Sequence, residues 1–200
     1  MNKLLIALVA VLSFSSVVQA QGNIEAGKAK SVTCAACHGE DGNSPSKLYP
    51  KLAGQHPGYL VKQLQQFKNG ERENAIMMGM AAILSEEDMR DLAAYYASKN
   101  TTPETITPEL ASAGQKIYMG GKGDVKMAAC SACHGPRGNG LELANFPKIS
   151  SQYPAYIKTQ LHNFRSKKRG NGPNGMMTGI AAKLTDEDIE LLSQYISALH

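Results

Sequence analysis

Two copies of one short motif, Cys-x-x-Cys-His, constrain the fold of this 200-residue chain more than any other feature. The copies span residues 34–38 and 130–134. Two thiols one helical turn apart can each add to one vinyl group of a haem, and the next residue then brings an imidazole nitrogen to the iron. The motif therefore predicts two covalently bound haem c groups. The predicted attachment residues are Cys34, Cys37, Cys130 and Cys133.

Other uses of paired cysteines fit this pattern less well. A thioredoxin-like dithiol needs one pair in a βαβ setting, and the pattern lacks such a setting. A zinc site needs its cysteine pairs roughly 15–20 residues apart, whereas most of a domain separates Cys37 from Cys130. Structural disulfides are common in exported proteins, but they do not explain a histidine after each pair.

The sequence around each motif is duplicated as well. Residues match at an offset that rises from 96 to 100 as a few residues are inserted in the second copy. The matched pairs include Pro50/Pro147, Gln55/Gln152, Tyr59/Tyr156, Arg72/Arg169, Met77/Met177 and Tyr95/Tyr195. We therefore predict two similar domains, residues 21–101 and 102–200. A Thr-, Pro- and Glu-rich linker at about 100–109 joins them, and we expect Pro103 and Pro108 to break any helix there.

Local signals within each half are helical. Ser85–Asp88 and Thr185–Asp188 have the form of capping boxes, and an amphipathic pattern follows each. Further helices are predicted over 59–68, over its copy 156–165, and leading into each cysteine pair from near Ile24 and near Leu110. The segments 39–56 and 135–152 are rich in Gly, Pro, Asn and Ser, and loops of that length are unusual unless they wrap something. The fold class predicted is all-α.

Each iron needs a sixth ligand or an open site, and this choice decides function. The nearby methionines are Met77, Met78 and Met80 in the first half and Met176 and Met177 in the second. Only Met77 and Met177 coincide in the repeat, so we predict them as axial ligands, with Met78 and Met176 as rivals. A thioether favours ferrous iron, raises the potential and closes the iron to small molecules.

His38 and His134 are the predicted histidine ligands. A ligand histidine usually has its other ring nitrogen hydrogen-bonded, and we predict that the carbonyls of Pro50 and Pro147 supply this contact. The other histidines have no histidine counterpart in the repeat and are predicted to be surface or packing residues: His56, His162 and His200.

The first twenty residues have the pattern of a secretory signal peptide. Lys3 gives a positive start, Leu4–Leu12 is an unbroken apolar run, and small residues precede a predicted cleavage after Ala20. The apolar stretch ending at Val18 is shorter than the roughly 20 residues that a spanning helix needs. We therefore expect an exported protein.

Charge and composition exclude some partners and agree with a haem protein. Lys and Arg total 21 against 17 Asp and Glu, an excess too small to favour nucleic acid. Aromatic residues make up 6% with no Trp, so a prosthetic group would help to fill small cores. The second half holds the excess, with 11 basic against 8 acidic residues. Arg165–Arg169 is a candidate docking patch for a redox partner, with a solvated loop as the alternative; the docking hypothesis assigns the contact to Lys167, Lys168 and Arg169.

The whole predicted mature chain resembles the cytochrome c4 family, the periplasmic di-haem class I cytochromes c of Gram-negative bacteria. The likeness lies in the leader, both haem motifs, both Pro-Lys-Leu/Ile segments and both Met-x-Gly-x-Ala-Ala-x-Leu stretches. It implies two class I cytochrome c domains related by a pseudo-twofold axis, with haem propionates near the interface. It also implies His38/Met77 and His134/Met177 as axial pairs.

The resemblance further implies a carrier of single electrons rather than an enzyme. Its expected partners are a cytochrome bc complex or another donor and a terminal oxidase such as the cbb3 type, with loose peripheral attachment to the membrane. The alternative is a di-haem peroxidase-like enzyme, which needs one iron that can open to substrate.

Overall fold

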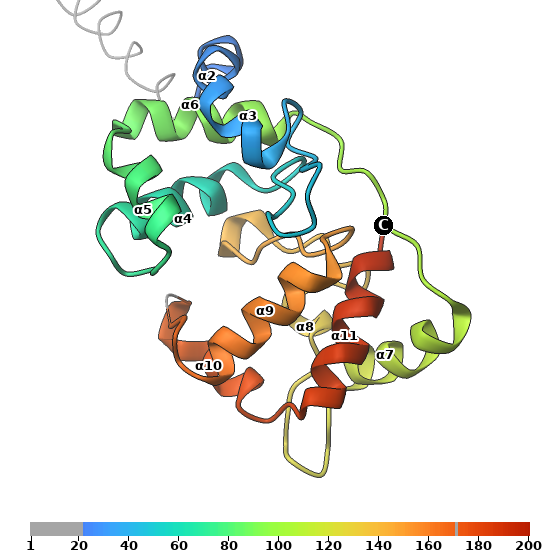
Figure 1. The fold of residues 1–200 in the computed structure, drawn as a ribbon. Coiled ribbons are helices and arrows are strands. Elements are labelled where there is room, and N and C mark those ends of the chain that lie inside the picture. Colours follow the sequence, from blue (N-terminus) through green and yellow to red (C-terminus); the bar gives the residue numbers. More distant parts are fainter. Residues whose placement is uncertain (1–21, 171) are drawn as a thin grey trace, which may run out of the picture.

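Two helical domains follow one another along the chain in the computed structural model of the protein (Figure 1). The structure describes residues 22–170 and 172–200, so the predicted leader and its cleavage after Ala20 lie outside the described residues. Within those residues β-structure is limited to two isolated bridges, Lys122–Met127 and Leu141–Phe146. The prediction of an all-α fold is confirmed.

The two domains contain corresponding helices. Those of the first are α2 (Ile24–Lys30), α3 (Val32–His38), α4 (Pro57–Lys68), α5 (Ala75–Ala82) and α6 (Glu86–Ala97). Those of the second are α7 (Pro108–Gly120), α8 (Ser131–His134), the 3-10 turn η2 (Glu142–Ala144), α9 (Pro154–Arg165), the 3-10 turn η3 (Pro173–Gly175), α10 (Met176–Ala181) and α11 (Asp186–Ala198). The predicted helices are present, but α5 and α10, which contain the methionines, were not predicted.

The first and last helices of each domain cross at a glycine. A Cβ atom on Gly27 of α2 would lie 2.0 Å from the Asp91 carbonyl oxygen of α6. A Cβ atom on Gly114 of α7 would lie 2.4 Å from the Cβ of Tyr195 on α11. Both crossings are therefore too close for any side chain, and this contact fixes the frame of each domain.

Capping boxes start both final helices, as predicted. Ser85 accepts a hydrogen bond from the Asp88 backbone N–H, and Asp88 accepts one from the Ser85 N–H, at the start of α6. Thr185 and Asp188 repeat the arrangement at the start of α11. These reciprocal bonds satisfy donors that a helix start otherwise leaves unpaired.

The connection between the domains has no helix from 100 to 107. We expected Pro108 to break a helix, but it is the first residue of α7. At that position the missing N–H of proline costs nothing. The second domain has an additional hairpin-like loop between Gly121 and Cys130, closed by the Lys122–Met127 bridge. The long loops of both domains, including those after α3 and α8, meet at the centre of the molecule (Figure 1).

Candidate haem-binding sites

The first cysteine pair lies on α3 and the second at the start of α8. Cys34 and Cys37 are one turn apart, and His38 is the last residue of that helix. Cys130 is the N-cap of α8, which ends at His134. In both copies the next residue is a glycine at positive φ, Gly39 at 80° and Gly135 at 75°, which turns the chain away after the histidine. None of the four cysteines is joined to another in a disulfide.

Both histidines are buried and held by the predicted prolines. The Nδ1 atom of His38 lies 2.9 Å from the Pro50 carbonyl oxygen, and that of His134 lies 3.0 Å from the Pro147 oxygen. A carbonyl oxygen can only accept, so Nδ1 carries the proton and Nε2 keeps its lone pair. Burial lowers the pKa of both rings, opposed by the bond to proline, and so favours the neutral imidazole that binds a metal.

A single cavity of about 1230 Å³ runs through both domains. This exceeds the range of roughly 300–1,000 Å³ typical of pockets for one small ligand. Its walls include all four cysteines and both motif histidines, and most of the remainder is apolar. The apolar lining includes Leu52, Leu60, Phe67, Leu92, Ile149, Ile157, Leu161, Phe164 and Leu192. The size, the apolar walls and the paired thiols fit two large flat prosthetic groups attached through sulfur.

The described residues offer no alternative site for a bare metal ion. They contain no cluster of three or more His, Cys, Asp or Glu side chains that could hold one. A single histidine beside two thiols and a methionine suits a haem, because the porphyrin already coordinates the iron.

The structure separates the methionines by their positions. Met77 and Met80 line the cavity, whereas Met78 does not and is 37% exposed. In the second domain Met176 and Met177 both line the cavity, but Met176 is 41% exposed while Met177 packs against the buried core. This arrangement favours Met77 over Met78 and Met177 over Met176, as the repeat does, but Met80 lines the cavity as Met77 does.

The comparisons with known proteins agree with this geometry. The family model for cytochrome c matches residues 24–99 and again 111–200. A cytochrome c4 from Thiocapsa roseopersicina is 49% identical over 180 residues, covering 89% of this chain and 93% of its own. The chain belongs to the cytochrome c4 family. Two covalently bound haem c groups are therefore its cofactors, and its function is that of a di-haem electron carrier.

Two further relatives extend the comparison. The crystal structure of reduced recombinant cytochrome c4 from Pseudomonas stutzeri superposes with a TM-score of 0.87 at 46% identity, covering 90% of this chain and all of that one. A protein from Thiomonas intermedia named thiosulfate dehydrogenase electron acceptor is 34% identical, covering 84% of this chain and 79% of its own. No helix among the described residues is long and apolar enough to cross a membrane.

A pair of glutamines joins the two domains reciprocally. Gln55 donates to the Lys148 carbonyl (2.8 Å) and accepts from the Lys148 N–H (2.9 Å). Gln152 makes the same two bonds to Lys51, at 2.9 and 3.0 Å. Because Gln55 and Gln152 are repeat partners, as are Lys51 and Lys148, the exchange shows the pseudo-twofold relation of the domains.

A second reciprocal set involves two arginines. Arg72 donates to the Tyr156 hydroxyl (2.9 Å), and Arg169 donates to the Tyr59 hydroxyl (2.9 Å), each reaching across to the other domain. Burial raises the pKa of Tyr156, but the two guanidiniums outweigh this and lower it overall. The repeat alignment contained these pairs, but only the fold shows that they meet.

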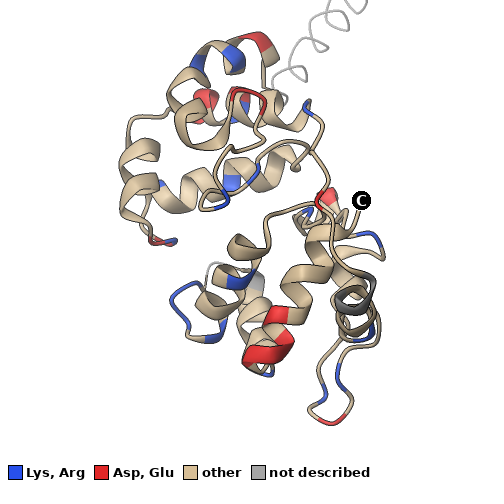
Figure 2. Ribbon diagram, turned by 45° about the vertical axis from the view of Figure 1, so that its right-hand side comes forward, with Lys and Arg blue, Asp and Glu red and all other residues tan. Residues whose placement is uncertain are grey.

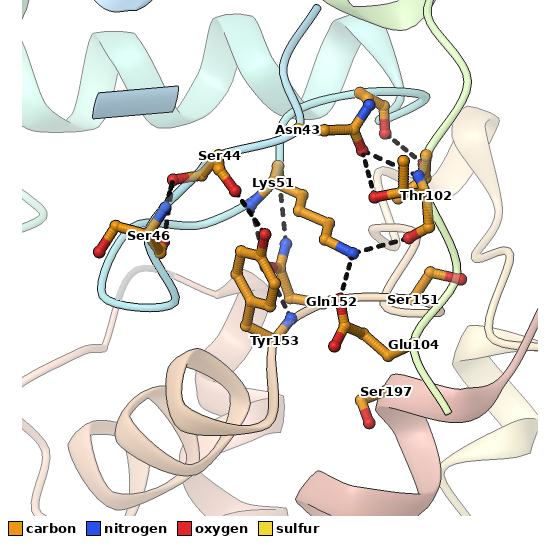
Figure 3. A network of polar contacts seen from close by, with 12 residues as sticks. Asn43, Ser44, Ser46, Lys51, Thr102, Glu104, Ser151, Gln152, Tyr153 and Ser197 are labelled. Carbon is orange, nitrogen blue, oxygen red and sulfur yellow. Dashed lines mark hydrogen bonds and ion pairs between the residues drawn. The ribbon is translucent and has the colours of Figure 1, made fainter. Parts of the chain in front are cut away.

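The lysines of the same interface are less symmetric. The Lys51 ammonium, only 1% exposed, donates to the Thr102 carbonyl and to Glu104 in the connecting segment, at 2.6 and 2.7 Å (Figure 3). The Lys148 ammonium donates to the Thr101 hydroxyl (2.9 Å), and burial lowers its pKa. The connection is thus tied more tightly to the first domain's lysine than to the second's.

These contacts test two predictions made for surface residues. The proposed docking segment Arg165–Arg169 is wrong in part, because Arg169 is buried at the domain interface and Arg165 pairs with Asp186. Of the four basic residues in that segment, Lys167 and Lys168 remain exposed. His56 packs across the interface, with Nε2 2.8 Å from the Asn139 carbonyl oxygen, in agreement with its predicted packing role.

Proposed function

We propose that each haem is held by two cysteine thioethers, one histidine and one methionine, in two domains of residues 21–101 and 102–200. The residues are Cys34, Cys37, His38 and Met77 in the first domain and Cys130, Cys133, His134 and Met177 in the second. The observation that carries this proposal is the pair of buried histidines, each fixed by a proline carbonyl in the tautomer that leaves Nε2 free beside a methionine-lined cavity.

The chemistry of such a site is restricted to electron exchange. A haem held by His38 and Met77, or by His134 and Met177, would supply one-electron chemistry between ferric and ferrous iron. The chain contributes neutral ligands, a largely apolar surrounding and the fixed orientation of each imidazole. Those features favour the ferrous state and exclude substrates from the iron, as a carrier requires.

We infer that the protein is exported to the periplasm and takes electrons from a cytochrome bc complex or another donor for delivery to a terminal oxidase. The family supports this role, and the relative named as an acceptor for thiosulfate dehydrogenase shows a different donor for a similar chain. Loose attachment to the membrane surface is part of the same proposal. Figure 2 shows Lys and Arg as well as Asp and Glu on both domains.

The partner surface is proposed to include Lys167 and Lys168. In the second domain Lys168 and Lys183 both line the cavity. Replacing both Lys167 and Lys168 by Gln should slow electron transfer to one partner and weaken its dependence on salt. Lys158→Gln, which removes a lysine already paired with Glu190, is the matched control. Equal rates in both variants would contradict this surface.

The rival function is a di-haem peroxidase-like enzyme with one iron that opens. The test is a visible spectrum of the oxidised and reduced protein with haem quantification, followed by exposure to carbon monoxide and peroxide at neutral pH. We expect two haems per chain, the weak band at about 695 nm that marks iron–thioether bonding, and no binding of either reagent. Rapid binding at one haem would favour the enzyme.

A further inference from the structure

The hydroxyl of Tyr96 is a buried donor that has no hydrogen bond of ordinary geometry. Tyr96 lies on α6, is 3% exposed and lines the haem cavity. Its oxygen makes no hydrogen bond of ordinary geometry to the described residues, although the Ser31 hydroxyl and the Cys34 sulfur both lie close enough to interact with it. A buried donor left unpaired is costly, so a small adjustment that brings the phenol onto one of these two acceptors is favourable.

Of these two acceptors, the Cys34 sulfur lines the haem cavity with Tyr96 and the Ser31 hydroxyl does not. Tyr96 belongs to the buried cluster of the first domain, against which Cys34 packs. Burial raises the pKa of the Tyr96 phenol, and the neighbouring Cys34 sulfur raises it further. The phenol therefore keeps its proton at neutral pH and can act only as a donor toward the sulfur.

The second domain fills the equivalent space differently. The repeat partner of Tyr96 is Ile196, which is equally buried, lines the same cavity and has no polar atom. An aromatic ring is instead supplied from α7 by Tyr118, which packs on Tyr195 at 5.4 Å between ring centroids, as Tyr96 packs on Tyr95 at 5.2 Å. The Tyr118 hydroxyl donates to the Gly135 carbonyl at 2.7 Å. Its proton is therefore already used by the protein.

We propose that the Tyr96 hydroxyl donates a hydrogen bond to the thioether sulfur of Cys34 and so raises the reduction potential of the first haem, through a contact that the second haem lacks. This rests on the proposed attachment of a haem at Cys34. The positive end of the O–H dipole draws electron density from a sulfur bonded to the macrocycle, and hydrogen bonding of this kind stabilises the reduced form. Tyr96 is thus a tuning residue that makes two similar sites inequivalent.

The test replaces Tyr96 by Phe in the full di-haem protein and measures both midpoint potentials by spectroelectrochemistry. We expect one midpoint to fall and the other to stay, changing the equilibrium constant for electron exchange between the haems by roughly three- to tenfold, where tenfold corresponds to 59 mV for one electron. Tyr118→Phe is the matched control, because it removes a buried phenol whose proton goes to a carbonyl. Unchanged midpoints in Tyr96→Phe, or equal shifts in both variants, would overturn the proposal.

A measurement on the unaltered protein guards against a variant that fails to fold. Resonance Raman bands of the thioether C–S bonds should shift in heavy water for one haem, since the donated proton exchanges, and the absence of any such shift would count against the hydrogen bond. A failure of the underlying attachment is distinguishable, because haem quantification and intact mass would then give fewer than two haems per chain.

Discussion

The two domains share a frame but differ in what fills it. Both cross their first and last helices at a glycine, both start the last helix with a capping box, and both fix the haem histidine through a proline carbonyl. The domains differ in other residues that line the cavity. The first domain places Tyr96 where the second has Ile196, and exposed Ile83 lines the cavity where the second has Lys183.

The methionine segments show the same contrast. Asn74 caps α5 by accepting a hydrogen bond from the Met77 N–H at 2.9 Å. Its repeat partner Asn174 adopts left-handed φ in the turn before α10, and α10 has no side-chain cap. The contacts that fix the motif histidines are thus duplicated, whereas the cap of the methionine helix and the proposed tuning residue Tyr96 are not. If the proposal for Tyr96 holds, this difference gives one fold two unlike redox centres.

The largest expected effect comes from removing one axial methionine. Met77→Ala should abolish about half of the iron–thioether band and let carbon monoxide bind one haem, because the iron loses its sixth ligand. The reduction potential of that haem should also decrease, because axial ligands set haem potentials over a range of about 0.8 V. Visible spectroscopy and redox titration measure these changes. Met78→Ala is the control and should leave the band intact; the opposite result would transfer the ligand role to Met78.

The helix crossings should be nearly as sensitive. Gly27→Ala forces a methyl group onto the backbone of α6 and should destabilise the first domain by about 1–3 kcal/mol or more. Thermal unfolding followed by circular dichroism measures the loss. Gly79→Ala on α5 is the matched control, since its Cβ would meet nothing within 4 Å, and it should be neutral or slightly stabilising. Equal losses in the two variants would refute a steric cause.

The cap of α5 should have a smaller and local effect. Asn74→Ala removes the acceptor for the Met77 N–H and should cost about 1 kcal/mol. The methionine band should then disappear at a lower temperature than in the unaltered protein, while the second haem is unaffected. Asn174→Gly, which keeps a residue suited to positive φ, should change neither. A loss of equal size at both sites would mean that the two segments are held alike.

The weakest expected effect concerns acid stability. The Lys30 ammonium, 2.5 Å away, and the Ser85 N–H lower the pKa of Asp88 to about 2, against about 3.9 in an unfolded chain. The unfolded state therefore takes up the proton first, so this stabilisation is complete above about pH 4 and is lost as the pH falls toward 2. Asp88→Asn should make the melting temperature depend less on pH between pH 4 and pH 2. An unchanged slope would show that other groups dominate there.

Much of the site follows from short segments of sequence. Cys34, Cys37 and His38 occupy consecutive turns of one helix, so their spacing alone specifies their chemistry. The choice of Met77 over Met78 came from the register of the repeat, and the exposure of Met78 agrees with it. The helices that contain the methionines were missed, because α5 and α10 have no clear amphipathic pattern and are short.

The sequence by itself determined that the chain is duplicated, helical and built to attach two haems, because each of those conclusions depends on residues close together in the chain or on a repeated pattern. Only the tertiary structure decided what happens between the copies. Arg169 appeared to belong to a basic surface patch, yet it is buried against Tyr59, 110 residues away in sequence. The buried phenol of Tyr96 likewise becomes visible only when its neighbours are assembled. Such contacts depend on how two folded units meet and pack, and no local pattern encodes that placement.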